Sequence, residues 1–502
     1  MRWRELFWRE EREGLSDRWE KWLLRGVVMV QMGIVVWDAL FLMEAYGMRR
    51  AQADCVAYLG AANSLLRGEW LRMPSLFEPL PHGWMSEWPL GYPAAIALTT
   101  KLTGLEPFYA SRWLNAFLYL LTYGMLAYFF PARAELILLL AIYPPNFTWN
   151  VALPLSENLF LPLLILVIAA FERYYESRRM VWLGVMLVAL PLLFLARYAS
   201  LAIVGAVGLW AIWRAFHRQY KEALLWGGVA AVGFGFAALY FAWNSYNHPA
   251  GESGLSLRNM PMPVGFIWLV LRDIRFLRYA ALVGLLTLAA GKLSKRKPSF
   301  TLAEEERNRF LLLLFLTQAA LYGWSMVKGR IGIVDTRHFV VILLPLLWYW
   351  AERLGQILSS WVLLGIGVVF LGWQIRNTHV HYQWSVEKKH LPYSYAEQVR
   401  QAYDTLPPRA CIIGASLAYL IKGRRTDLCL GDRDGYLPVL LRDCPCIYVD
   451  CAMVGQRFGL GIASGIMWAF VKFCDTSCKG RSICLKKIGC ASSLPKSSGG
   501  SP

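Results

Sequence analysis

Long apolar stretches separated by short polar segments dominate the chain. A helix that crosses the hydrocarbon core of a bilayer needs about 20 mainly apolar residues. The apolar stretches predict about eleven such helices, at 26–46, 109–130, 134–151, 155–171, 180–196, 198–216, 223–243, 277–291, 310–327, 338–353 and 357–373. This pattern predicts an all-α polytopic membrane protein, with residues 1–25 as an amphipathic segment before the first span.

Two short helices are predicted in the polar segment 47–108. In RRAQADCVAYLGAANSLLRGEW, the residues Asp54, Tyr58 and Ala61 recur at i, i+4 and i+7. One face of this helix would carry the carboxylate, and the other could rest on lipid. Gly68 is typical of a helix stop, and Pro93 in EWPLGYPAAIALTTKLTG marks the start of the next helix. A carboxylate held at the membrane surface makes Asp54 a candidate for chemistry.

Composition agrees with the membrane interpretation. Of the 502 residues, 57% are hydrophobic and only 17% are charged, against about 25% in soluble domains. The formal charge of +18 comes from cations between apolar spans, where they orient helices and meet anionic lipid. No nucleic-acid recognition motif accompanies this charge. The segment before the first span is too long and too acidic for the n-region of a cleaved signal peptide, so we expect the first span to be retained.

The distribution of Lys and Arg predicts the orientation. With a cytoplasmic N-terminus, the inner loops hold Arg133, Arg173, Arg178, Arg179, Arg214, Arg218, Lys221, Lys292, Lys295, Arg296, Lys297 and Arg353. The outer segments also carry cations, namely Arg197, Arg258, Arg272, Arg275, Lys328, Arg330 and Arg337. An odd number of spans places everything after residue 374 outside. The protein is therefore expected in the inner or plasma membrane.

Cysteine usage is an independent indication of sidedness. Nine of the ten cysteines lie between Cys411 and Cys490, and the tenth is Cys55. All ten fall on the predicted outer side, where disulfides form. Disulfides or buried thiols are one interpretation. A zinc site built from Cys444, Cys446, Cys474 and Cys478 is the other, although the spacing matches no standard finger or ribbon.

Residues 374–490 predict a small extracytoplasmic α/β domain. ACIIG at 410–414 and CIYVD at 446–450 have the composition of short strands, with helical ASLAYLIKG and GYLPVLLRD beside them. The apolar stretch 458–473 is Gly-rich and short for a span, and it is interpreted as a membrane-lying or domain helix. The low-complexity tail 491–502 is expected to be disordered.

These pieces, in order, resemble the GT-C superfamily of membrane glycosyltransferases. The resemblance is strongest to the bacterial relatives of protein mannosyltransferases and to the lipid A aminoarabinose transferase. It rests on the acidic first outer loop, WPLGYPAAIALTTKLTG, SRWLNAFLYLLTYGMLAYF, PLSENLFLPLLILVIAAFER, RYASLAIVGAVGLWAI, WNSYNHPAGESG and DTRHFVVILLPLL. It covers most of residues 25–450, and the tail beyond about 451 has no counterpart.

The resemblance implies transfer of a sugar from a polyprenyl-phosphate donor to an extracytoplasmic glycan, lipid or protein. Such a reaction needs a base for the acceptor and cations or a metal, Mg or Mn, for the leaving phosphate. Asp54 matches the family's acidic position in the first outer loop and is expected to be the base. Glu44, Glu69, Glu78 and Glu87 are options for a second acidic residue, of which Glu87, just before the Gly-Tyr-Pro turn, is best placed.

Further site residues are predicted at the outer ends of the spans. Glu157 could order a metal, bind sugar hydroxyls or pair with an arginine such as Arg197. The residues Arg197, Arg337, Lys328 and Arg330 are candidates for the lipid phosphate, because guanidinium presents a planar fork of donors. Snorkelling to lipid headgroups is the alternative for both arginines. His338 stands where the family more often has an aromatic residue.

Other functional classes lack their signatures. Walker A, GxSxG and HExxH motifs are absent from the sequence. A secondary transporter would show paired halves with interrupted helices, and no such repeat is visible. A transporter and a non-catalytic GT-C-like scaffold remain the alternatives to a transferase. Transfer through a single base predicts inversion at the anomeric carbon.

Overall fold

The computed structural model is mainly helical, and a small part of the chain is in β-strands. It describes residues 15–42, 53–70, 72–73, 83–84, 89–131, 133–139, 151, 153–247, 282–285, 287–288, 300–327, 336–357, 360–387, 394–408, 410–413, 429–431, 446–450 and 485–490. The chain folds into two compact units. The first contains 1–42, 115–152 and 156–384, and the second contains 43–114, 153–155 and 385–502.

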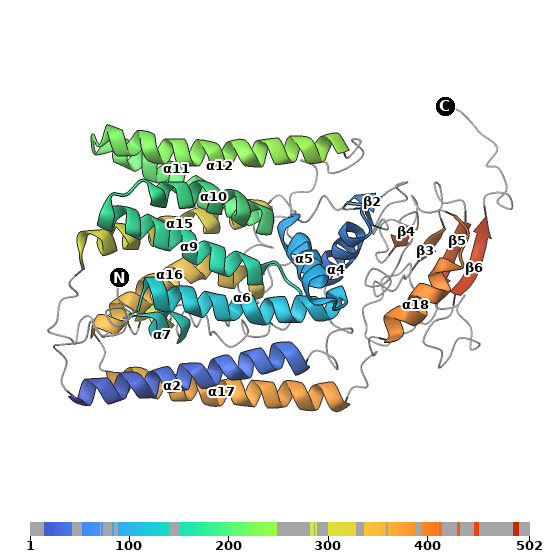
Figure 1. Ribbon diagram of the computed structural model, residues 1–502, viewed down its shortest axis with the longest axis horizontal. Helices are drawn as coiled ribbons and strands as arrows, with labels where there is room; N and C mark the ends of the chain where they lie inside the picture. Colours follow the sequence, from blue (N-terminus) through green and yellow to red (C-terminus); the bar gives the residue numbers. More distant parts are fainter. Residues whose placement is uncertain are drawn as a thin grey trace. The chain divides into compact units, whose positions relative to one another are not determined.

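The first unit is a bundle of long helices (Figure 1). Its elements are α2 (Leu15–Trp37), the π-helix η1 (Asp38–Leu42), most of α6 (Pro107–Phe129), α7 (Ala134–Ile137), α9 (Glu157–Ser177), α10 (Val181–Ala196), the 3-10 turn η3 (Tyr198–Ser200), α11 (Leu201–Phe216), α12 (Tyr220–Asn247), α15 (Leu302–Val327), α16 (Thr336–Ile357) and α17 (Ser360–Glu387). α11 packs against α12, and α15 packs against α9, α11 and α16.

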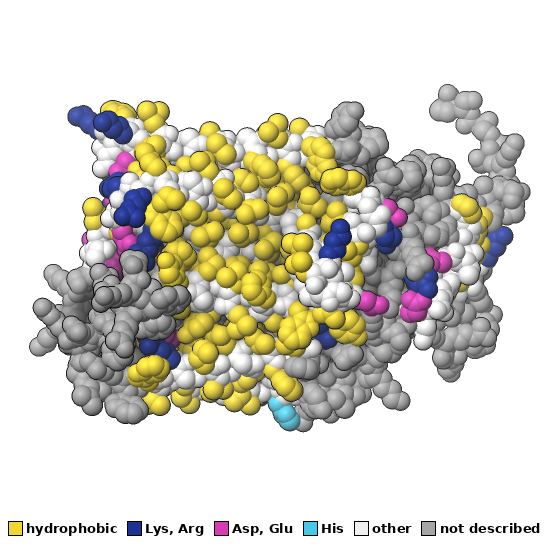
Figure 2. Space-filling model, in the orientation of Figure 1, with side chains coloured by type: hydrophobic (Ala, Val, Ile, Leu, Met, Phe, Trp, Pro, Cys, Tyr) yellow, Lys and Arg dark blue, Asp and Glu magenta, His cyan; other side chains and the backbone are white. Residues whose placement is uncertain are grey.

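Four stretches among the described residues are long and apolar enough to cross a membrane. They are Trp22–Leu40, Glu157–Ser177, Tyr198–Phe216 and Tyr220–Trp243, and the apolar helix Val181–Ala196 is shorter. Figure 2 shows hydrophobic side chains over much of the visible face of the bundle, with charged side chains gathered at its left-hand end. This distribution suits helices surrounded by hydrocarbon. The count of eleven stays a prediction, since 277–291 lies largely outside the described residues.

One helix runs further than the apolar pattern predicts. The sequence predicts a membrane span at 357–373, and the helix α17 that contains most of it continues to Glu387. The extension QIRNTHVHYQWSVE is polar but contains neither Pro nor Gly, so nothing in it stops a helix. Hydropathy predicts where a helix leaves the hydrocarbon, not where its backbone hydrogen bonding ends.

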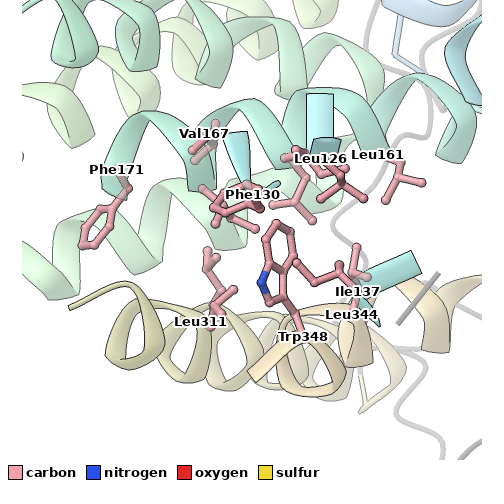
Figure 3. Packing of buried hydrophobic residues seen from close by; sticks show 14 of the residues in the cluster. Leu126, Phe130, Ile137, Leu161, Val167, Phe171, Leu311, Leu344 and Trp348 are labelled. Atoms are coloured by element: carbon pink, nitrogen blue, oxygen red, sulfur yellow. The ribbon is translucent and has the colours of Figure 1, made fainter. Parts of the chain in front are cut away.

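Aliphatic and aromatic side chains pack together in the core that α9, α15 and α16 share with neighbouring helices (Figure 3). Phe171 of α9 stacks on Phe310 of α15, with ring centroids 4.1 Å apart and planes within 4°. Trp348 of α16 meets Phe130 edge to face at 5.0 Å. The indole N–H of Trp348 donates a hydrogen bond of 3.0 Å to Glu352, so its polar atom is satisfied inside the bundle. These contacts pack the three helices against one another.

A network of buried ion pairs joins the bundle near the start of α15. Arg307 donates to both carboxylate oxygens of Glu172 at 2.7 Å and to Glu352 at 2.6 Å. Arg133 contacts the same Glu352 and also Glu304, the latter at 2.5 Å. Arg307 is 1% exposed and Glu352 1% exposed, so these charges are compensated by one another rather than by water. The network links α9, α15, α16 and the turn before α7.

The second unit contains the segment predicted to carry the acidic outer loop. Helix α4 (Ala53–Leu66) packs against α5 (Gly91–Thr103), and Tyr58 meets Tyr92 edge to face at 5.3 Å. α4 ends before Gly68, which has a left-handed φ of 75°, as the sequence predicts. α5 begins two residues before Pro93. Between the helices, β1 (Arg72–Met73) pairs antiparallel with β2 (Gly83–Trp84).

The expected lipid-facing side of α4 is wrong. Most of the side chains described in α4 are buried, namely Cys55, Ala57, Tyr58, Leu59, Ala61, Ala62 and Ser64, and those of Asn63, Leu65 and Leu66 are partly exposed. Most of the buried ones are small, so neighbouring backbone can approach from several directions. α4 is therefore embedded in protein rather than lying half in lipid.

A four-stranded sheet follows α18 (Ser394–Asp404) in the second unit. The order is β4 (Cys429–Gly431), β3 (Cys411–Ile413), β5 (Cys446–Asp450) and β6 (Leu485–Cys490). β3 pairs in parallel with β4 and β5, and β6 runs antiparallel to β5. The strands predicted at 410–414 and 446–450 are β3 and β5. Parallel neighbours need crossover connections. The helices predicted beside these strands lie outside the described residues.

Candidate functional site

The best-described polar cluster lies where α9 begins and α10 ends. Glu157 is the first residue of α9, and Arg197 follows α10 in an extended conformation that breaks the helix before η3. A guanidinium nitrogen of Arg197 lies 2.5 Å from a carboxylate oxygen of Glu157. The Arg197 Nε–H also donates to the Tyr322 hydroxyl of α15 at 3.2 Å. Three helices thus meet at one arginine.

Both partners of this ion pair are largely buried. Glu157 is 1% exposed, and the side chain of Arg197 is 13% exposed. The Ser156 hydroxyl lies 3.4 Å from the second carboxylate oxygen of Glu157. One alternative raised from the sequence, a pairing of Glu157 with Arg197, is therefore what the structure shows. The charge of Arg197 compensates that of Glu157. A ligand that binds Arg197 and displaces Glu157 must therefore offset the free energy lost with this ion pair.

The other predicted residues are placed less completely. Asp54 is the second residue of α4 and Arg337 the second residue of α16, both in the first turn of their helices. A carboxylate in the first turn interacts favourably with the helix dipole. Glu87, Lys328 and Arg330 lie outside the described residues. The roles assigned to these five residues stay predictions.

The described residues do not fit a metal site. They contain no group of three or more His, Cys, Asp or Glu side chains that could hold an ion. Glu157, the carboxylate considered for a metal, is already occupied by the cation of Arg197. The zinc interpretation of the tail is wrong for Cys446, because its sulfur and that of Cys411 are in disulfides. A disulfide sulfur is no thiolate ligand.

Three polar residues near this cluster were not found from the sequence. Tyr322, Gln318 and Ser200 are all buried, and they belong to α15 and η3. Gln318 could have been noticed as an amide inside the apolar run LLLLFLTQAALYGW. Nothing in the sequence indicates that Tyr322 reaches Arg197, which is 125 positions away along the chain.

Comparisons with known proteins bear on the fold. No family model and no curated protein matches the chain. Among solved structures, ArnT from Cupriavidus metallidurans in the apo state superposes with a TM-score of 0.55, at 14% identity, over 88% of this chain and 95% of that chain. The same protein bound to undecaprenyl phosphate gives a TM-score of 0.53, at 14% identity, over 87% and 94%.

A more distant similarity involves the apo oligosaccharyltransferase of Archaeoglobus fulgidus. The TM-score is 0.46 and the identity 11%, over 90% of this chain and 72% of that chain. The superposition on ArnT extends over nearly the whole of both chains and includes the helical bundle. The chain therefore has a GT-C-like fold.

Proposed function

We propose that the protein is a membrane glycosyltransferase that transfers a sugar from a polyprenyl-phosphate donor to an extracytoplasmic acceptor. The observation that carries the proposal is the near-complete match to ArnT, a structure of which contains undecaprenyl phosphate. The buried Glu157–Arg197–Tyr322 cluster supports it, because charged groups inside a membrane bundle mark substrate sites by default.

In the proposed reaction, an acceptor hydroxyl or amine attacks the anomeric carbon of the donor. Asp54 accepts the proton from the acceptor, the new bond to carbon forms, and the bond from carbon to the phosphate oxygen breaks. The lipid phosphate leaves with the bonding electrons. A single displacement without a glycosyl-enzyme intermediate inverts the anomeric configuration. General-base assistance of this kind contributes roughly 10²–10⁴-fold to the rate.

The other predicted residues have supporting roles in this proposal. Glu87 assists Asp54 as a second acidic residue. The cations Arg337, Arg197, Lys328 and Arg330 compensate charge on the departing phosphate. Glu157 holds Arg197 before the donor binds and contacts the sugar afterwards. Because the described residues do not fit a divalent ion, no step of the reaction is assigned to one.

We also propose that residues 374–490 form an extracytoplasmic α/β domain and that the N-terminus is cytoplasmic. The disulfides of Cys411 and Cys446 support an oxidising compartment for this segment. Acceptors of a surface transferase are found on that side. Assays with candidate acceptors determine whether the acceptor is a glycan, a lipid or a protein.

The test is mass spectrometry of products formed by purified protein in detergent with a panel of undecaprenyl-phosphate sugars and candidate acceptors. Wild type is expected to release undecaprenyl phosphate, and Asp54→Asn to release it roughly 10²–10⁴-fold more slowly. Glu106→Gln, an exposed residue just before α6, is the control and should match wild type. Equal rates for wild type and Asp54→Asn would remove Asp54 from its role. No release from any donor, with acceptors supplied and the protein folded, would favour a transporter or a scaffold.

A further inference from the structure

The inward face of α15 carries a polar group that the bundle does not satisfy. Gln318 is 1% exposed, and both its amide nitrogen and its amide oxygen lack hydrogen-bond partners. The same face holds Phe310, Leu311 and Leu314 on one side of Gln318 and Tyr322 on the other. An amide buried without partners costs free energy, so a ligand that forms hydrogen bonds with it is favoured.

The helix register places Gln318 near the Glu157–Arg197–Tyr322 cluster. α15 and α9 pack side by side, with Arg307 on Glu172 and Phe310 on Phe171. Toward the other end of α15, Tyr322 reaches Arg197, the partner of Glu157 at the start of α9. Gln318 precedes Tyr322 by one turn and so lies on the same face, about 6 Å further into the bundle.

The hydroxyl of Ser200 is a second buried polar group without a hydrogen-bond partner, in an element that packs against α15. Ser200 itself is fully buried, and it belongs to η3. Its backbone N–H is bonded to the carbonyl oxygen of Arg197 at 2.9 Å. Ser200 is therefore held three residues from the arginine of the cluster while its side chain stays available. Gln318 and Ser200 come from different elements, so their shared lack of partners is not one local defect.

We propose that Gln318 and Ser200 bind the hydroxyl groups of the donor's sugar. This inference rests on the proposed function and names the residues that recognise the glycosyl group. An amide and a hydroxyl each donate and accept hydrogen bonds, as sugar hydroxyls do, and neither carries charge. The adjacent Arg197 supplies the cation that suits the phosphate. The neutral groups of Gln318 and Ser200 therefore suit the sugar of the donor, and the cation of Arg197 suits its phosphate.

The experiment compares two ligands on the purified full-length protein. The dissociation constant is measured by native mass spectrometry for bare undecaprenyl phosphate and for undecaprenyl phosphate carrying mannose, glucose, N-acetylglucosamine or 4-aminoarabinose. Gln318→Leu should weaken binding of the preferred glycosylated lipid by about tenfold, as expected for the loss of one or two hydrogen bonds. Its affinity for the bare lipid should not change. Ser200→Ala should show the same selectivity with almost no change in side-chain volume.

A matched control is Gln374→Leu in α17, which makes the same substitution at another buried glutamine. It should leave both affinities at the wild-type value. The thermal midpoint of Gln318→Leu should equal or exceed that of wild type, because the substitution removes an unsatisfied amide. A lower midpoint would indicate a structural role.

The outcomes separate this inference from the proposed function. If wild type prefers a glycosylated lipid and both variants keep that preference, Gln318 and Ser200 do not bind the sugar. Equal weakening of bare and glycosylated lipid would also overturn the inference, since the effect would not depend on the sugar. If wild type binds neither lipid, the proposed function fails, and the inference fails with it.

Discussion

Glu304 shows how one residue can serve two contacts at the start of a helix. Its carboxylate accepts a hydrogen bond from the Thr301 backbone N–H at 2.8 Å, and the Thr301 hydroxyl accepts one from the Glu304 N–H at 3.3 Å. This is a reciprocal capping box that starts α15. The carboxylate also pairs with Arg133. Burial raises the pKa of Glu304, but the Thr301 N–H and Arg133 outweigh it, so the net pKa is below the usual 4.5.

This depressed pKa predicts a pH dependence of stability. The contribution of the Glu304 charge is fully present above pH 4.5 and is lost as the pH falls through the lower native pKa. Glu304→Gln keeps a capping side chain but removes the charge, so it should destabilise the protein by about 1 kcal/mol at pH 7. Thermal melts in detergent should show this difference shrinking as the pH falls below 4.5. Glu305→Gln, on the exposed face of the same turn, is the control. A difference that is constant with pH would contradict the assignment.

Helices α9, α15 and α16 depend on charges that their hydropathy does not reveal. Arg307 is held by Glu172 and Glu352, and these three residues are spread over 180 positions of the chain. Each charge is tolerated in the bundle only because its partners come from neighbouring helices. At the same time, Phe171 and Phe310 stack beside the network. The pairing therefore selects one register of α15 among several that apolar contacts alone would allow.

The expected consequence is a strong difference between single and double substitutions. Arg307→Leu should destabilise the protein by about 3–5 kcal/mol, because Glu172 loses its partner inside the bundle. Combining it with Glu172→Leu should restore much of that loss, since Glu352 keeps Arg133. Unfolding in detergent, followed by tryptophan fluorescence, gives both values. A double variant as unstable as the sum of the single variants would show that the two residues act independently.

Much of the bundle could be predicted from the sequence, because the length and the apolar composition of a membrane helix identify it. The expected spans 109–130, 180–196 and 198–216 agree with α6, α10 and η3–α11 within a few residues. The sequence TLAE at 301–304 also has the spacing of a capping box. Long-range pairing was not predictable in general, since Arg307 could have paired with any of several carboxylates. The pair Glu157–Arg197 was only one of several options.

Different physical effects stabilise each of the two units internally. The helical bundle has a large apolar core, while the sheet of the second unit has short strands and two cysteines in disulfides. Small β units bury little apolar surface, so covalent links contribute a larger share of their stability. We therefore expect the two units to respond differently to reducing agents.

Dithiothreitol provides the test at this scale. Reduction should destabilise the sheet by about 2–4 kcal/mol per disulfide and expose 411–490 to proteases. Cleavage within the bundle, for example in the α11–α12 turn, should proceed at an unchanged rate and serves as the internal control. Peptide mapping with and without reductant distinguishes the two regions. Equal protection of 411–490 in both conditions would mean that the disulfides are dispensable for the sheet.

The contacts at the two ends of α15 have a consequence for how this protein can vary. Arg307 fixes one end and Tyr322 the other, with Gln318 between them. One residue added or removed between positions 311 and 317 would rotate everything beyond it by about 100° and shift it by about 1.5 Å. Gln318 and Tyr322 would then turn away from η3, although every side chain would still be present. In this segment the number of residues is constrained more tightly than their identity.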